Sequence, residues 1–273
     1  MTSEIFNFKR FGNYFRYDLK QMWRNHSKPA VFIGGLGLIV YVLWVLMGLV
    51  FSGGHWDSPE TGARISVFVA AFIVLVLYQT RTYGYLTEKQ KGSAWLMIPA
   101  SSLEKFISML LITLIVIPLL FVVVFLAIDS ILVLLDPTLS QTIAGSALGE
   151  LQDAQARLSE SQSSTFFTPS GGIVTVLIIL SLVSSLLFFL LSGLCFKRYK
   201  ILGGVGVLFA LEVVISILAS VFIPDWARTL VDLDEVNAAQ AVGRMFNWSV
   251  AVSALIAIGL AVGIYYRIKT IKH

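Results

Sequence analysis

One carboxyl residue stands in the middle of a long apolar run and is the first candidate for chemistry. Glu212 lies eleven residues after Ile201 and eleven before Ile223, so a helix over this run would place it at the centre of a bilayer. A charge at that depth costs about 2.5–3.5 kcal/mol on insertion scales. We therefore expect Glu212 to face the protein interior, to be protonated or to have a partner. Both a proton-transfer role and a helix-bridging role are open.

Other polar residues within the apolar runs are weaker candidates. Asp129 falls near the outer end of the third run, where we expect an interfacial acid within reach of water; substrate contact is the alternative. Ser181, Ser184 and Ser185 lie in the fourth run, where small polar residues let membrane helices pack closely and form hydrogen bonds. Packing is the default interpretation of these serines, and lining a polar pathway is the sharper one.

The last apolar run has a stripe of small residues at four-residue steps. Such a stripe predicts a helix-packing face, either within the subunit or across a dimer. Its members are Ser249, Ser253, Ala257 and Ala261.

Several kinds of chemistry lack their parts. The chain contains neither the G-x-x-x-x-G-K-[ST] phosphate-binding motif nor the H-E-x-x-H metal motif. The three histidines, His26, His55 and His273, all lie outside the apolar runs, and Cys195 is a single cysteine. We expect no enzyme activity, no metal site and no bound cofactor in this chain.

Composition then indicates the elements that must position these residues. The chain is 57% hydrophobic and 13% charged, with a mean hydropathy of +0.83, which is typical of an integral membrane protein. About 20 apolar residues are needed to cross the hydrocarbon core, and in lipid such segments must be helices. We predict an all-α fold, a single transmembrane domain over residues 1–273, with six spans at about 30–51, 64–85, 103–135, 172–196, 200–223 and 247–267.

Basic residues orient these spans. In a six-span arrangement all 20 lysines and arginines lie on one side except Arg64, Arg157, Arg228 and Arg244. The side rich in lysine and arginine is the cytoplasmic one, so both termini should be cytoplasmic. The sequence pI of about 9.2 reflects this topology and does not predict nucleic-acid binding, since no basic soluble domain is present.

The segments between the spans have their own character. Residues 1–28 carry Phe8, Phe11, Phe15, Leu19 and Met22 at three- and four-residue steps, which predicts an amphipathic helix lying on the inner leaflet. The first span should open at Pro29, a residue that favours helix starts. Pro118 should kink the third helix. Residues 136–170 and 224–246 are predicted outer excursions, each with a short surface helix.

The most informative loop is the predicted cytoplasmic segment 86–102. Residues 94–98 read Ala-Trp-Leu-Met-Ile, an apolar run on the water side of the membrane that must be covered by headgroups or by another protein. Pro99 then breaks the chain, and Ser101 with Glu104 has the spacing of a capping box that starts a new helix. This arrangement predicts a lever between a cytosolic partner and a membrane span.

The segment TEKQKGSAWLMIPASSLEKFISMLL, which includes this loop, resembles the first cytoplasmic loop of permease subunits of type-2 ABC exporters, and especially those of Bacteroidetes. The matching positions are Glu88, Gly92, Ala94, Trp95, Leu96, Met97, Ile98, Pro99, Ser101 and Glu104. The specific match covers about 25 residues, and the rest is a likeness of architecture. The long outer loop at 136–170 departs from the family pattern.

The resemblance implies a partner and a location. Residues 94–98 would form the coupling helix that docks in a groove of a separate ATPase subunit, which would bind the ATP and Mg²⁺. Two permeases, either two copies of this chain or this chain and a paralogue, would pair with two ATPases in the inner membrane of a bacterium.

Two functions of other classes are open beside an ATP-driven exporter. A proton-coupled carrier would work alone with Glu212 as its titrating group. A membrane scaffold or immunity protein would bind a partner through the outer excursions and move no substrate.

Overall fold

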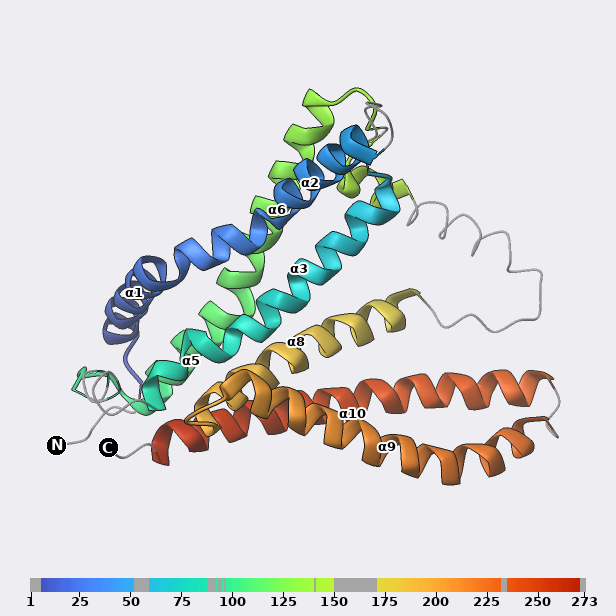
Figure 1. The fold of residues 1–273 in the computed structure, drawn as a ribbon. Helices are drawn as coiled ribbons and strands as arrows, with labels where there is room; N and C mark the ends of the chain where they lie inside the picture. Colours follow the sequence, from blue (N-terminus) through green and yellow to red (C-terminus); the bar gives the residue numbers. More distant parts are fainter. Residues whose placement is uncertain are drawn as a thin grey trace. The chain divides into compact units, whose positions relative to one another are not determined.

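The computed structural model describes residues 6–51, 59–87, 92, 95, 97–139, 141–149, 171–231 and 235–270. These residues are helical apart from short turns, and no strand occurs among them, as the sequence predicted. The chain forms two compact units (Figure 1), one of Met1–Tyr78 with Leu103–Ser159 and the other of Gln79–Ser102 with Glu160–His273. The chain therefore passes from the first unit to the second within one helix and returns just before Leu103.

The first unit is a bundle of long helices. Its elements are α1 (Phe8–Gly34), α2 (Leu36–Phe51), α3 (Thr61–Thr82, whose last residues belong to the second unit), α5 (Ser102–Leu111), the π-helical turn η2 (Ile112–Val116) and α6 (Ile117–Leu135). Both α1 and α2 pack against α6.

The break between the amphipathic helix and the first span was placed wrongly at Pro29. Helix α1 continues through Pro29 and ends at Gly34, and the backbone N–H of Gly35 donates to the carbonyl of Val31 at 2.8 Å. A Cβ on Gly34 would come within 2.8 Å of Val124 Cγ1. Gly34 therefore lets the end of the helix approach α6 closely, whereas a proline is tolerated inside the helix.

The third helix contains a π-helical turn just before Pro118, the residue at which the sequence predicts a kink. The regular helix α5 gives way to η2, and the backbone N–H of Ile117 donates to the carbonyl of Ile112, five residues earlier. Pro118 follows directly, and it has no N–H to continue the regular pattern. A π-turn next to a proline is a recognised way to absorb such a missing bond.

The second unit contains the 3₁₀ turn η1 and three long helices. The elements are η1 (Gly84–Thr87), α8 (Gly171–Cys195), α9 (Lys200–Val231) and α10 (Glu235–Thr270). Helices α8 and α10 lie side by side, and their buried residues include Leu187, Leu190, Ala257 and Ile264. A short turn separates α8 from α9, between Cys195 and Lys200, where the predicted fourth and fifth spans are also only three residues apart.

The predicted outer excursion 224–246 takes a different form. In place of a separate surface helix, α9 runs on to Val231 and α10 already begins at Glu235. Most of the other predicted excursion, at 151–170, lies outside the described residues, but residues 143–149 are helical.

Among the described residues, five helices are long and apolar enough to cross a membrane. They are Thr61–Thr87, Ser102–Leu135, Ile173–Cys195, Lys200–Ile217 and Gly243–Thr270. A shorter apolar helix, Leu36–Phe51, belongs to the first predicted span. The chain is thus a helical protein of the membrane-embedded type.

Candidate functional site

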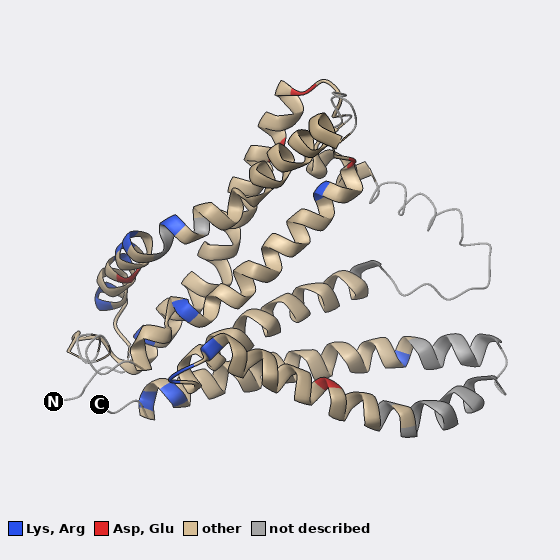
Figure 2. Ribbon diagram, viewed as in Figure 1, with Lys and Arg blue, Asp and Glu red and all other residues tan. Residues whose placement is uncertain are grey.

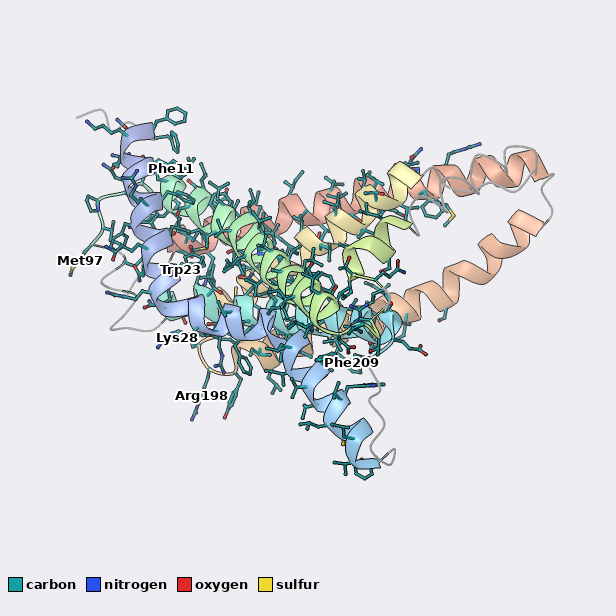
Figure 3. The ribbon with its side chains drawn as sticks, turned by 90° about the horizontal axis from the view of Figure 1, so that it is seen from above. Phe11, Trp23, Lys28, Met97, Arg198 and Phe209 are labelled. Carbon is teal, nitrogen blue, oxygen red and sulfur yellow. The ribbon has the colours of Figure 1, made fainter. Side chains whose placement is uncertain are left out.

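The loop before α5 buries one aromatic side chain and exposes a neighbouring apolar one. Gly92 and Trp95 are helical and buried, and the Trp95 side chain is 4% exposed. Met97, two residues later, is 83% exposed and points away from the chain (Figure 3). The two side chains therefore differ: that of Trp95 is buried within the chain, and that of Met97 is presented outward.

A short turn follows and leads into α5. The backbone N–H of Ile98 donates to the carbonyl of Trp95 at 3.4 Å, and that of Ala100 to the carbonyl of Ile98 at 2.8 Å. Pro99 is exposed, and α5 begins at Ser102, one residue after the predicted cap Ser101. Three other predicted loop residues, Glu88, Ala94 and Leu96, lie outside the described residues.

Glu104 is held by the amphipathic helix. Its side chain is fully buried, and its carboxylate accepts bonds from Arg10 Nε at 2.8 and 2.9 Å and from the backbone N–H of Asn7 at 2.9 Å. One turn further along α5, the Ser108 hydroxyl donates to Asp18 at 2.7 Å, again within the protein. The Arg10 Nε–H is shared between both carboxylate oxygens, and hydrogen bonds between charged groups are stronger than those between neutral groups.

These bonds revise the predicted face of α1. Phe8 is 83% exposed, whereas Tyr14, Asp18 and Met22 are buried at four-residue steps. Asp18 is an acidic residue between Tyr14 and Met22 on this face. An acidic residue at such a position indicates, from the sequence alone, that the face has a polar partner. Side-chain hydrogen bonds therefore link α1 to α5, in addition to the apolar residues that α1 buries.

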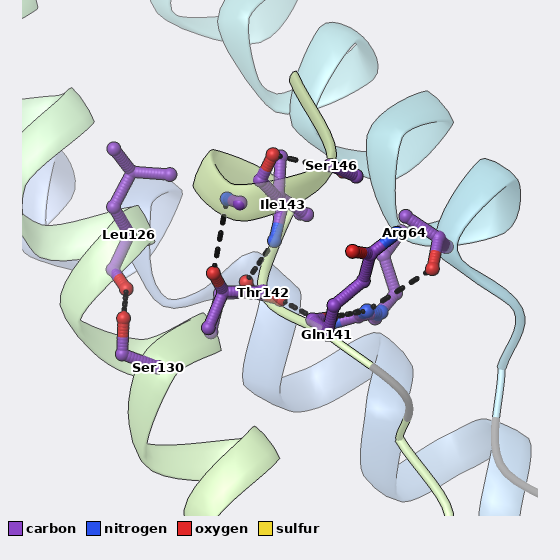
Figure 4. Close-up of polar contacts among 10 residues, drawn as sticks. Arg64, Leu126, Ser130, Gln141, Thr142, Ile143 and Ser146 are labelled. Atoms are coloured by element: carbon purple, nitrogen blue, oxygen red, sulfur yellow. Dashed lines mark hydrogen bonds and ion pairs between the residues drawn. The ribbon is translucent and has the colours of Figure 1, made fainter. Parts of the chain in front are cut away.

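Asp129 is buried in an ion pair, whereas the sequence-based expectation placed it within reach of water. It is 4% exposed; its Oδ1 accepts from Arg64 Nη1 at 2.6 Å and its Oδ2 from the backbone N–H of Ile143 at 2.7 Å. The other guanidinium nitrogen of Arg64, Nη2, donates to the carbonyl of Gln141 (Figure 4). The pair therefore joins α3, α6 and the segment that follows α6.

An apolar cavity of about 110 Å³ lies beside this ion pair. Its wall is formed by α2, α3 and α6 and includes Tyr41, Trp44, Phe125 and both charged residues. Cavities of similar size, about 150 Å³, hold a single small apolar molecule. The Tyr41 hydroxyl donates to Asp136 at 2.6 Å, so it is engaged within the protein.

Glu212 is exposed on α9. Within the part of the chain that the structure describes, no hydrogen bond or ion pair reaches its carboxylate. The Lys200–Ile217 window of α9 is only 6% buried, compared with 22% for Ile173–Cys195 of α8. The expectation that Glu212 faces the interior is therefore not met within one copy of the chain.

The remaining candidates are the serines of α8 and the small-residue stripe of α10. Some of these side chains are packed inside the chain, and others are exposed. Ser185 donates to the carbonyl of Ser181 in its own helix at 2.8 Å, and the Ser184 hydroxyl is buried with no partner among the described residues. Of the small-residue stripe on α10, Ala257 is buried, Ser253 and Ala261 are half-buried, and Ser249 is exposed. The stripe thus contributes to packing within the subunit through Ala257.

Comparison of the chain with protein-family models, with curated proteins and with solved structures gives no match.

Proposed function

We propose that this chain is the membrane-spanning permease subunit of an ATP-driven ABC exporter. The supporting observation is Met97, an apolar side chain 83% exposed on the loop between α3 and α5. A single exposed apolar side chain is common on protein surfaces and does not by itself mark an interface. Met97 supports docking because it stands in the run that the resemblance assigns to a coupling helix, next to the buried Trp95.

The distribution of basic residues supports a cytoplasmic position for this loop. Figure 2 shows blue residues along α1 in the first unit and, in the second, at the turn between α8 and α9 and at the end of α10. With six spans, these segments and the loop lie on the same side of the bacterial inner membrane. The ATPase partner, which would bind the ATP and Mg²⁺, acts from that side.

Chain connectivity explains how a push on the loop would be transmitted. The loop belongs to the second unit, but α3 precedes it and α5 follows it, and both lead into the first unit. Movement of the loop therefore acts on both units through the backbone. The Arg10–Glu104 ion pair makes α1 follow the start of α5.

The exposed Glu212 favours a second permease subunit in the complex. A lone carboxyl facing lipid at mid-membrane carries a cost of about 2.5–3.5 kcal/mol, which burial against a polar partner reduces. The sparsely packed face of α9 is where a second copy of the chain or a paralogue would cover it.

The decisive experiment measures Mg²⁺-dependent ATPase activity that purifies with the tagged chain from its native membranes. Met97→Asp should abolish the bound activity, because a charge cannot enter an apolar groove without loss of affinity. Met97→Leu is the matched control and should retain it. Trp95 is unsuitable for this test because it is buried, so its substitution would disturb the loop itself.

Each outcome separates the alternatives. ATPase activity that survives Met97→Asp would refute docking at this residue. Substrate flux in vesicles without ATP, lost in Glu212→Gln, would indicate the stand-alone carrier. A chain that inserts normally but supports no flux with or without ATP would indicate a scaffold.

A further inference from the structure

A basic cavity of about 470 Å³ lies at the turn between α8 and α9. It is lined by Arg81, Lys197, Arg198, Tyr199, Lys200, Ile201 and Leu202, all of the second unit. One water occupies about 30 Å³ in the liquid, so the cavity is an order of magnitude larger than a site for one ordered water. None of these lining residues is acidic.

Hydrogen bonds hold the walls of this cavity in place. Lys200 Nζ donates to the carbonyl of Gly84 at 2.6 Å, and the Ser192 hydroxyl donates to the carbonyl of Lys200 at 2.9 Å. A Cβ on Gly84 would come within 3.1 Å of the Lys200 side chain, which would then have to shift by a few tenths of an ångström. The turn is thereby joined both to η1 and to α8.

Three cations in the cavity are available to a ligand. Arg81, Lys197 and Arg198 are exposed, and no carboxylate among the described residues pairs with any of them. Arg198 lies over the ring of Tyr199, with its guanidinium carbon 5.7 Å from the ring centroid. This contact fixes the position of one cation without neutralising its charge.

An apolar strip leads away from the cavity along α9. Leu202 lines the cavity and is 73% exposed, and Phe209, two turns further along the same helix, is 70% exposed. Both Arg198 and Phe209 extend outward from the ribbon in Figure 3. A ligand that has both an anionic group and hydrocarbon chains would satisfy the cavity and the strip together.

We infer that this cavity binds the phosphate headgroup of an anionic phospholipid of the inner leaflet, with the acyl chains along α9. The topological bias toward basic residues explains the charges at the turn, but it does not explain an open pocket with hydrogen-bonded sides next to an apolar strip. Basic pockets on the cytoplasmic side of helical membrane proteins are known to take such headgroups. The inference is independent of the proposed export function.

The test compares lipid retention by native mass spectrometry of the purified full-length chain. Wild type should retain phosphatidylglycerol in preference to phosphatidylcholine. The variant R81Q/K197Q/R198Q should lose this preference by about tenfold or more, since each basic residue contributes separately to anionic lipid attraction. The control K9Q/R16Q/K20Q removes the same charge from exposed positions of α1 and should keep the preference.

Three results would overturn the inference. An equal loss in the cavity variant and the α1 control would mean that attraction is non-specific. Competition by soluble glycerol phosphate at the same concentration as lipid would mean that a free phosphate compound is the ligand. A wild type with no preference, whose cavity variant instead loses a bound protein, would assign the cavity to an acidic protein segment. R81K/R198K, which keeps both charges, should retain the lipid and shows whether the cavity tolerates substitution.

Discussion

At the scale of single residues, two buried carboxylates, Glu104 and Asp129, are paired with arginines from distant segments. Arg64 and Asp129 are 65 positions apart in the sequence, yet both are buried and bonded to each other. Removing one partner of a buried pair leaves an uncompensated charge, which costs about 3–5 kcal/mol, whereas removing both is much less harmful.

We therefore expect Asp129→Asn to destabilise the chain more than the double variant R64M/D129N. Asparagine keeps an oxygen that can accept the bond from the backbone N–H of Ile143, so the single variant isolates the loss of charge. Thermal unfolding in detergent, followed by tryptophan fluorescence, measures both. A double variant no more stable than the single one would show that the unpaired charge is not the source of the loss.

The ion pair also shows what the sequence could not reveal. Each residue stands alone in its own apolar run, and only antiparallel packing of α3 and α6 brings them together. In the same way, the run Ala94–Ile98 indicated an apolar loop, but an apolar pattern does not say which side is turned inward. Trp95 is turned inward and Met97 outward because of tertiary contacts.

At the scale of helices, glycines set where elements approach closely. A Cβ on Gly193 of α8 would overlap the backbone carbonyl of Thr80, which belongs to the same unit. A backbone atom cannot move aside as a side chain can, so the two helices would have to separate. Gly259 of α10, by contrast, has no atom within 4 Å of a Cβ at its position.

Gly193→Ala and Gly259→Ala should consequently have opposite effects on stability. Overpacking costs about 1–3 kcal/mol, so Gly193→Ala should lower the unfolding temperature. An open helical glycine replaced by alanine gains about 0.5–1 kcal/mol, so Gly259→Ala should leave it unchanged or raise it. Unfolding temperatures of the two variants in one detergent provide the measurement. Equal values would mean that α8 does not need this close approach.

The helices themselves were largely predictable, because apolar length and composition are strong signals in a membrane protein. The turn before Lys200 was predictable from its polar residues. The irregular turn next to Pro118 was predictable because proline has no N–H to donate. The end of α1 was missed because Pro29 looked like a helix start, although a proline inside a helix is tolerated when packing supplies other contacts. Gly34, which contacts α6, was the relevant residue.

At the scale of the whole molecule, the Lys200–Ile217 part of α9 has the smallest buried share of the five candidate spans among the described residues. Its exposed residues include Leu208, Glu212 and Ile215, which lie on one face at steps of four and three residues. This face holds a polar group amid hydrocarbon and is sparsely packed within the chain. A second permease that covers this face would account both for the polar Glu212 amid hydrocarbon and for the sparse packing of α9.

Cysteine cross-linking in membranes tests that arrangement. In a Cys195→Ser background, cysteines placed singly at Leu208, Glu212 and Ile215 should include at least one that forms a disulfide between copies, because identical residues meet near a two-fold axis. Ile178→Cys on α8 is the control, since Ile178 is 55% exposed and Ile215 is 60% exposed. Absence of a dimer band at all three α9 positions, or an equal band at Ile178, would contradict a two-fold contact between copies of this chain through α9. Co-expression of two differently tagged chains then distinguishes a pair of identical copies from a pair with a paralogue: only identical copies would be recovered together through either tag.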